Sequence, residues 1–203
     1  MSKKGKFIVF EGLDGSGQST QVSILEKYLR SKKRKVHITA EPSNNLIGGL
    51  IRALLTKQWK LSNAGMQLLY CADRAHHLES EVYPALEKGN DVISSRYYFS
   101  TMAYGSLNNE VEWLEKLNEK FPQPDLTFFI NVSPKECVRR IEGSRFRKEF
   151  FEKEKKLTKV RQTYLRLSEN KKYRNFFVIN GEQPVEKVAE DIREIINKEL
   201  RIK

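Results

Sequence analysis

The sequence predicts an α/β protein built in three layers, with a central parallel sheet of about five strands flanked by helices. Short apolar runs alternate with segments of helical periodicity along all 203 residues, a pattern typical of parallel strands joined by helical crossovers. The run at 126–132 is apolar almost throughout, as expected for a strand buried on both faces. No repeat or linker composition interrupts the pattern, so we expect one domain over residues 1–203.

Five apolar runs are the expected strands, and helices are expected between them. The strands are expected at 7–10, 36–39, 91–95, 126–132 and 176–179. Helices are expected at 20–30, 50–55, 63–74, 76–88, 100–103 and 110–120, from 134 onward, and at 157–167 and 185–200. The highly charged segment 142–156 is expected to interrupt the helices.

The composition favours a polyanionic ligand. The chain has 37 Lys and Arg against 26 Asp and Glu, a net charge of +11, which suits nucleotides or nucleic acid. The densest basic run, 32–35, falls where a helix is expected to end, and there cations complement the helix dipole. Because no zinc-finger, RRM or KH pattern is present, we expect no nucleic-acid partner.

Cysteine usage and hydropathy indicate the compartment. Cys71 and Cys137 are far apart and match no metal-binding spacing, which favours reduced thiols in a reducing compartment. We find no signal-peptide pattern and no apolar run long enough to span a membrane. The expected location is cytoplasmic, with no membrane partner.

A glycine-rich stretch between the first strand and the first helix predicts a phosphate-binding loop. Residues 12–19 follow the pattern G-x-x-x-x-G-K-[ST] except at one position, where Gln18 replaces the lysine. The glycines let successive N–H groups converge, and the helix that follows contributes its positive dipole end. The predicted ligands of a nucleotide di- or triphosphate are Gly12, Leu13, Asp14, Gly15, Ser16, Gly17, Gln18, Ser19 and Thr20, with Ser19 also the candidate Mg²⁺ ligand.

Five further short patterns follow the loop in order. They are Glu41-Pro42; Tyr70-Cys71-Ala72-Asp73-Arg74; Arg96-Tyr97 with Ser100, Ala103 and Tyr104; Pro124-Asp125-Leu126-Thr127; and Phe151-Glu152 with Leu157, Val160 and Tyr164. With FEGLDGSG at 10–17, they extend over nearly the whole chain, and by them the chain resembles thymidylate kinases, within the P-loop nucleoside-monophosphate kinases. The resemblance implies a P-loop NTPase fold with a mobile lid at about 141–152. It also implies a homodimer that transfers the γ-phosphate of ATP to dTMP with Mg²⁺ as cofactor.

The same resemblance assigns roles to individual residues. Arg74 and Arg96 would hold the acceptor phosphate, with Arg52 a third candidate; Tyr70 would stack on the base, and Asp14 would bind the sugar hydroxyl or organise magnesium. Arg145 and Arg147 would close over the transferred group, and Arg139 or Arg140 would flank the adenine. The full acceptor set is Asp14, Glu41, Arg52, Tyr70, Arg74, Arg96, Ser100 and Tyr104, and the catalytic set is Gln18, Arg96, Arg145 and Arg147.

Simpler interpretations of these residues stay open at this point. The arginines suit surface ion pairs or a solvated face, Tyr70 suits a core position on a helix, and Asp14 suits a turn.

Three positions depart from the pattern of the family. Gln18 supplies no charge where the pattern has lysine, and Ser95 stands where the aspartate of D-R-Y is expected. Gly105 stands where a polar base-reading residue often follows A-Y. The first two changes remove opposite charges, so local neutrality is kept. A working kinase is our interpretation, and a slow or non-catalytic nucleotide-binding protein is the alternative.

Overall fold

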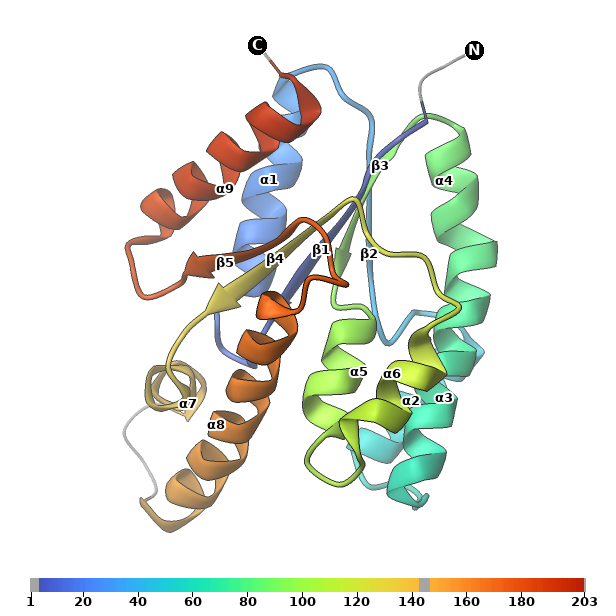
Figure 1. Ribbon diagram of the computed structural model, residues 1–203, viewed down its shortest axis with the longest axis vertical. Coiled ribbons are helices and arrows are strands. Elements are labelled where there is room, and N and C mark those ends of the chain that lie inside the picture. Colours follow the sequence, from blue (N-terminus) through green and yellow to red (C-terminus); the bar gives the residue numbers. More distant parts are fainter. Residues whose placement is uncertain (1–3, 143–146, 203) are drawn as a thin grey trace.

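The computed structural model describes residues 4–142 and 147–202, without the side chains of residues 142 and 147–153. Five parallel strands form one sheet in the order β2-β3-β1-β4-β5 (Figure 1). The strands are β1 (Phe7–Gly12), β2 (Val36–Ala40), β3 (Asp91–Ser95), β4 (Leu126–Asn131) and β5 (Phe176–Asn180). All five lie where the sequence predicts them.

Helices cover both faces of the sheet. They are α1 (Gln18–Ser31), α2 (Leu46–Leu55), α3 (Asn63–His77), α4 (Tyr83–Glu87), α5 (Tyr98–Gly105), α6 (Val111–Asn118), α7 (Pro134–Glu142), α8 (Arg147–Glu169) and α9 (Val185–Leu200). Helices α1 and α9 pack together on one face, and α4, α5 and α8 pack on the other (Figure 1). The predicted three-layer α/β fold with a parallel sheet is therefore confirmed.

The segment from 63 to 87 is continuous, as the predicted helix at 63–74 and its continuation at 76–88 indicate, and a π-helical turn, η1 (Leu78–Val82), joins α3 to α4. One stretch differs from the helices that the sequence predicts. The expected interruption over 142–156 is wrong from residue 147 onward, since α8 begins at Arg147. Glu, Lys and Arg are good helix formers, so this stretch is helical although it lacks the apolar stripe used to predict helices.

Aromatic side chains anchor α8 to the centre of the sheet. Phe128 and Phe129 on β4 are fully buried, and the Phe129 ring stacks on that of Tyr164 from α8 at a centroid distance of 4.7 Å. Burying side chains of this size contributes about 1.5–3 kcal/mol each. Helix α8 is therefore held against the sheet at the position from which the Tyr164 hydroxyl reaches β1.

The register of the two central strands determines where the candidate site forms. Phe10 of β1 pairs with Ser95 of β3, so the segments that follow these strands, 13–17 and 96–97, leave the sheet side by side. In open parallel sheets, ligands bind beyond the carboxyl ends of the strands, where the chain order changes direction. Here β1 is the central strand, with β3 and β4 on either side.

The stacked aromatic pair allows a direct stability measurement. Replacing Phe129→Ala should lower the free energy of unfolding by about 3–5 kcal/mol, because it removes a buried ring and leaves a cavity. Val178→Ala on β5, where the side chain is 43% exposed, is the control and should cost less than about 1 kcal/mol. Urea denaturation of the three proteins measures both values, and equal losses would contradict the proposed anchoring.

Candidate active site

The loop after β1 curls into a cradle at the start of α1. Gly15 and Gly17 have φ angles of 85° and 90°, in the left-handed region that glycine enters without strain. Helix α1 begins directly after Gly17, so its first N–H groups lack intrahelical partners and face the loop. A cavity of about 360 Å³ opens there and is lined by residues 13–20, Ser95 and Arg96.

This cradle fits a nucleotide phosphate chain. Glycines with positive φ and a free helix N-terminus are the features that bind phosphate oxygens. The Ser16 hydroxyl, buried in the same loop, has no hydrogen-bond partner in the described part of the chain. The exposed Ser19 lies in the lining of the cavity as well, which puts a hard oxygen where a phosphate-bound cation would sit.

Two of the three departures from the family pattern, Gln18 and Ser95, touch each other. The Gln18 amide nitrogen donates to the Phe10 carbonyl at 3.0 Å and to the Ser95 hydroxyl at 3.2 Å. Gln18 is only 7% exposed, so this amide is a fixed part of the wall below the phosphate cavity. A neutral hydrogen bond therefore joins the two positions at which the family pattern has a lysine and an aspartate.

Arg96 reaches across from β3 to the phosphate loop. Its guanidinium donates to the Asp14 carboxylate at 2.7 Å and to the Ser100 hydroxyl at 2.9 Å, and it lies over the Tyr104 ring. The Arg96 backbone has a φ of 73°, a strained conformation for a residue with a side chain. Strain of this kind persists only where neighbouring contacts maintain it.

Those contacts come from the buried carboxyl of Glu11, the next-to-last residue of β1. Glu11 accepts hydrogen bonds from the backbone N–H of Tyr97 at 2.9 Å, the Ser100 hydroxyl at 2.5 Å and the Tyr164 hydroxyl at 2.9 Å. Burial raises the pKa of the Glu11 carboxyl to about 7, and the hydrogen bond from Ser100 and the charge of Arg96 offset this only in part. Glu11 thus ties β1, the Arg96 turn and α8 together.

A second cavity, of about 330 Å³, adjoins the loop on the side of α3 and α5. Its lining contains seven of the eight predicted acceptor residues. The lining residues are Asp14, Glu41, Pro42, Leu55, Asn63, Met66, Gln67, Tyr70, Arg74, Arg96, Tyr97, Ser100, Thr101, Tyr104 and Asn108. Burial raises the pKa of Tyr70 to about 12, so its ring enters the cavity as a neutral, flat apolar surface.

Arg74 lies at the back of this cavity with its charge already balanced. It is 1% exposed, and its guanidinium donates to Glu41 at 2.7 Å, to Asn118 at 2.6 Å and to Thr101 at 2.9 Å. Burial opposes the charge, but Glu41 raises the pKa of Arg74 above its ordinary value. Only its Nε has no hydrogen-bond partner in the described part of the chain. A guanidinium with these partners holds the cavity wall, and Arg96 is the cation better placed for an incoming phosphate.

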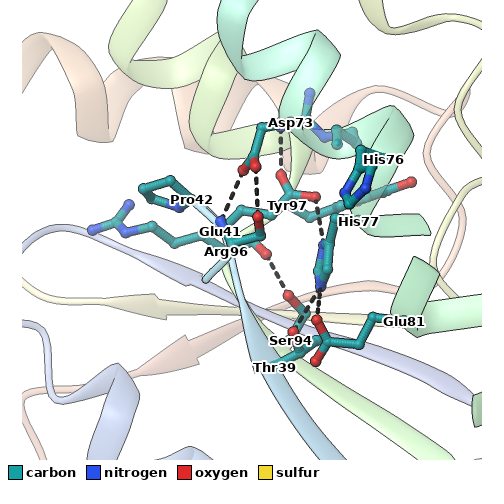
Figure 2. Close-up of polar contacts among 12 residues, drawn as sticks. Thr39, Glu41, Pro42, Asp73, His76, His77, Glu81, Ser94, Arg96 and Tyr97 are labelled. Carbon is teal, nitrogen blue, oxygen red and sulfur yellow. Dashed lines mark hydrogen bonds and ion pairs between the residues drawn. The ribbon is translucent and has the colours of Figure 1, made fainter. Parts of the chain in front are cut away.

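Glu41 is itself held from behind. Figure 2 shows the His77 ring pointing between Glu41 and the pair formed by Thr39 and Glu81. The His77 nitrogens lie 3.3 Å from Glu41 and 2.6 Å from the Thr39 hydroxyl, and His77 is fully buried. This cluster fixes the end of β2 and with it the orientation of Glu41 toward Arg74.

Other predicted residues lie elsewhere. Arg52 is outside the acceptor cavity, where it donates to the Ser43 carbonyl at 2.6 Å. Arg139 is exposed and pairs with Glu136 at 2.7 Å, whereas Arg140 donates to the carbonyls of Ser16 and Gly181 at 3.3 and 3.2 Å. Of the two arginines considered for the adenine site, Arg140 is therefore the one beside the phosphate loop.

Residues 143–146 of the predicted lid, 141–152, lie outside the described residues, and the side chains of residues 142 and 147–152 are not described. Arg145 falls in the undescribed segment 143–146, and Arg147 begins α8 with its side chain outside the description. Within residues 4–142 and 147–202, no group of three His, Cys, Asp or Glu side chains could hold a metal ion by itself. Among the same residues, no helix is both long and apolar enough to cross a membrane.

Several residues of the site were not predicted from the sequence. Glu11 had a visible signal, because a carboxylate inside the apolar run 7–12 must find buried partners. Gln67, Thr101 and Asn108 carried no such signal, since each resembles an ordinary polar position on a helix or in a turn. Their place in the acceptor cavity follows from the packing of α3 against α5.

The glycine-rich loop lies between a central parallel strand and a helix, and Arg74 and Arg96 line the adjoining cavity. These features define a P-loop nucleotide-binding protein with a second ligand site. The family model described as thymidylate kinase matches residues 10–192. A "Probable thymidylate kinase" of Pyrococcus abyssi is 36% identical over 97% of this chain and 98% of its own length. A "Thymidylate kinase" of Thermosipho melanesiensis is 39% identical over 96% and 98%, and one of Desulfotalea psychrophila is 38% identical over 93% and 92%. The chain belongs to the thymidylate kinase family.

The raised pKa of Glu11 predicts a pH dependence of stability. A carboxyl with a folded-state pKa of about 7, against an ordinary value of 4.5, stabilises the fold fully below about pH 4.5 and loses that contribution as pH rises through 7. Relative to Glu11→Gln, the unaltered protein should therefore lose up to about 3 kcal/mol of unfolding free energy between pH 5 and 8.

Urea denaturation at several pH values measures this difference. The two proteins differ only at position 11, so contributions from the rest of the chain cancel. Parallel stability profiles for the two proteins would contradict the assignment.

Proposed function

We propose that the chain transfers the γ-phosphoryl group of ATP to dTMP, giving dTDP. One observation carries the proposal: Arg96 and Asp14 line both the phosphate-loop cavity and the acceptor cavity. A guanidinium between two anion-binding cavities is placed to neutralise charge on a group that passes from one to the other. The family to which the chain belongs supports thymidylate as the acceptor.

The residues of the chain position the reactants and form no covalent intermediate. The loop from Gly12 to Thr20 holds the donor phosphates through its N–H groups, and the Tyr70 ring supports the acceptor base. Arg96 exchanges its ion pair with Asp14 for the acceptor phosphate, whose oxygens suit the guanidinium fork. A magnesium ion bound to the nucleotide would supply further positive charge to the phosphates. The hydroxyls of Ser19 and Ser95, which line the donor cavity, would hold this ion.

Other parts of the proposal rest on the family resemblance. Arg145 and Arg147 are proposed to add positive charge over the transferred group, and residues 141–152 to act as the lid. A single domain over residues 1–203, a homodimer and a cytoplasmic location are proposed on the same basis.

The activity and the role of Arg96 are tested together. Purified protein with ATP, magnesium and dTMP should release ADP in a coupled assay, with dTMP preferred over CMP and AMP. Arg96→Ala should lower kcat/KM for dTMP at least 100-fold, because charge-assisted hydrogen bonds to the phosphate are lost. Arg166→Ala, an exposed arginine on α8, is the control and should leave turnover unchanged.

An absence of dTMP-dependent turnover with intact nucleotide binding would favour the non-catalytic alternative. A preference for CMP or AMP would contradict thymidylate as the acceptor.

The contact between Gln18 and Ser95 predicts non-additive kinetics. Gln18→Lys alone would place an ammonium group against the Phe10 carbonyl with no carboxylate to balance it. The double variant Gln18→Lys with Ser95→Asp restores both charges, so its turnover should exceed that of either single variant at least tenfold.

The measurement is a double-mutant cycle on kcat/KM. Gln18→Lys combined with Ser168→Asp, a serine on α8, is the matched control and should show additive effects. Additivity in the Gln18 and Ser95 cycle would mean that the two positions act separately.

A further inference from the structure

A third cavity, which we call the lysine cavity, has a volume of about 400 Å³ and takes no part in the proposed mechanism. Its lining consists of Leu107 and Asn108, from the turn after α5, and of three lysines of α8, Lys155, Lys156 and Lys159. Asn108 is exposed and lines the acceptor cavity as well. The lysine cavity and the acceptor cavity therefore adjoin at their rims.

The positive charge of the lysine cavity is not balanced by its surroundings. Lys159 follows Lys155 by four residues and Lys156 by three, so the three exposed side chains share one helix face. In the part of the chain that the structure describes, none of the three makes an ion pair or a hydrogen bond through its side chain, and no carboxylate lines the cavity. Three uncompensated cations around one hollow raise the local concentration of anions.

Hydrogen bonds fix the lysines in place beside the acceptor cavity. The hydroxyls of Ser106, after α5, and Thr163, on α8, lie 3.0 Å apart, and Thr163 stands one helical turn beyond Lys159. The Asn108 backbone N–H donates to the Gly105 carbonyl at 3.1 Å, which closes the turn that the two cavities share. The position of the lysine cavity is therefore set by the packing of α5 against α8.

The charge of the lysines reaches the place where the acceptor phosphate is expected. Tyr164 stands five residues after Lys159, about 7.5 Å along the helix axis. Its hydroxyl lies 2.9 Å from that of Ser100, to which Arg96 donates at 2.9 Å. A charge acts over about 10 Å at 0.1 M salt and about 30 Å at 0.01 M salt. At low ionic strength the field of the lysines therefore extends through the acceptor cavity to Arg96.

We propose that Lys155, Lys156 and Lys159 capture the nucleoside monophosphate at the rim of the acceptor cavity through the charge of its phosphate group. A monophosphate carries about two negative charges at neutral pH, so it meets the lysines first and then passes Asn108 on its way to Arg96. The lysines raise the rate of association and leave the chemical step unchanged, because they are absent from the described linings of the donor and acceptor cavities. This inference rests on the proposed function.

The first test removes the three charges together. The triple variant Lys155→Gln, Lys156→Gln and Lys159→Gln keeps long side chains with good helix propensity. At about 20 mM salt its association rate constant for dTMP, measured by stopped-flow tryptophan fluorescence, should be at least about fivefold lower than that of the unaltered protein. At about 300 mM salt the difference should shrink below about twofold, because the charges are screened. The kcat at saturating dTMP should stay within about twofold.

The second test changes the same positions and keeps the charge. The triple variant Lys155→Arg, Lys156→Arg and Lys159→Arg should associate with dTMP within about twofold of the unaltered rate at both salt concentrations. Because the two triple variants alter the same helix face, charge is the property that separates them. An equal loss in both would mean that the shape of this face matters, and it would overturn the inference.

The third test changes the ligand and leaves the sugar and the base. Thymidine lacks the phosphate, so its association rate constant should be the same within about twofold in the unaltered protein and in the glutamine variant at about 20 mM salt. A loss for thymidine as large as that for dTMP would contradict capture through the phosphate charge.

The matched control is the triple variant Lys27→Gln, Lys88→Gln and Lys198→Gln, which removes the same net charge at exposed lysines outside the three cavities. It should associate with dTMP like the unaltered protein, and a loss equal to that of the first variant would overturn the inference. Turnover of dTMP by the unaltered protein is measured first. Its absence contradicts the proposed function, whereas normal turnover with unchanged association in the glutamine variant contradicts the role of the lysines alone.

Discussion

The candidate site depends on one buried carboxyl, that of Glu11. It stands where β1 ends and receives hydrogen bonds from the turn after β3 and from Tyr164 on α8. These contacts hold the positive φ of Arg96 and therefore the position of its guanidinium. A buried carboxyl with this many donors costs desolvation but ties three separate segments to one point. The phosphate loop and the arginine beside it are in this way placed as a unit.

Charge in the site is distributed differently from what the phosphate-loop pattern leads one to expect. Gln18 and Ser95 form a neutral contact below the donor cavity, and Arg74 is neutralised by Glu41. Arg96 remains as the partly exposed cation between the two cavities, and its partner Asp14 is largely exposed. An ion pair that is open to solvent is weak, so the exchange of Asp14 for a phosphate costs little. The acceptor cavity thus keeps its arginines, although the lysine and the aspartate of the family pattern are missing from the wall of the donor cavity.

Much of this arrangement could be predicted from local sequence. The five strands are short apolar runs with turns on either side, and the glycines at 12–17 predict the phosphate-binding loop. Arg96 and Tyr104 belong to a recognisable pattern. The place of Gln67 in the acceptor cavity could not be predicted, because it arises only where α3 packs against α5 and Gly105 has no side chain. The same limit applies to the contact of Gln18 with Ser95, which depends on the register that pairs Phe10 with Ser95. Long-range packing, rather than local propensity, determines these positions.

The position of Arg74 shows why a residue type does not settle a role. The family resemblance assigns equal parts to Arg74 and Arg96 as phosphate ligands. Arg74 lies buried at the back of the cavity, where it donates to Glu41 and Asn118 and His77 supports Glu41. Removing a buried guanidinium from such partners would leave a carboxylate unpaired, at a cost of several kcal/mol. Arg74 therefore belongs to the fixed wall of the acceptor cavity, and a phosphate gains more from Arg96, whose ion pair with Asp14 is open to solvent.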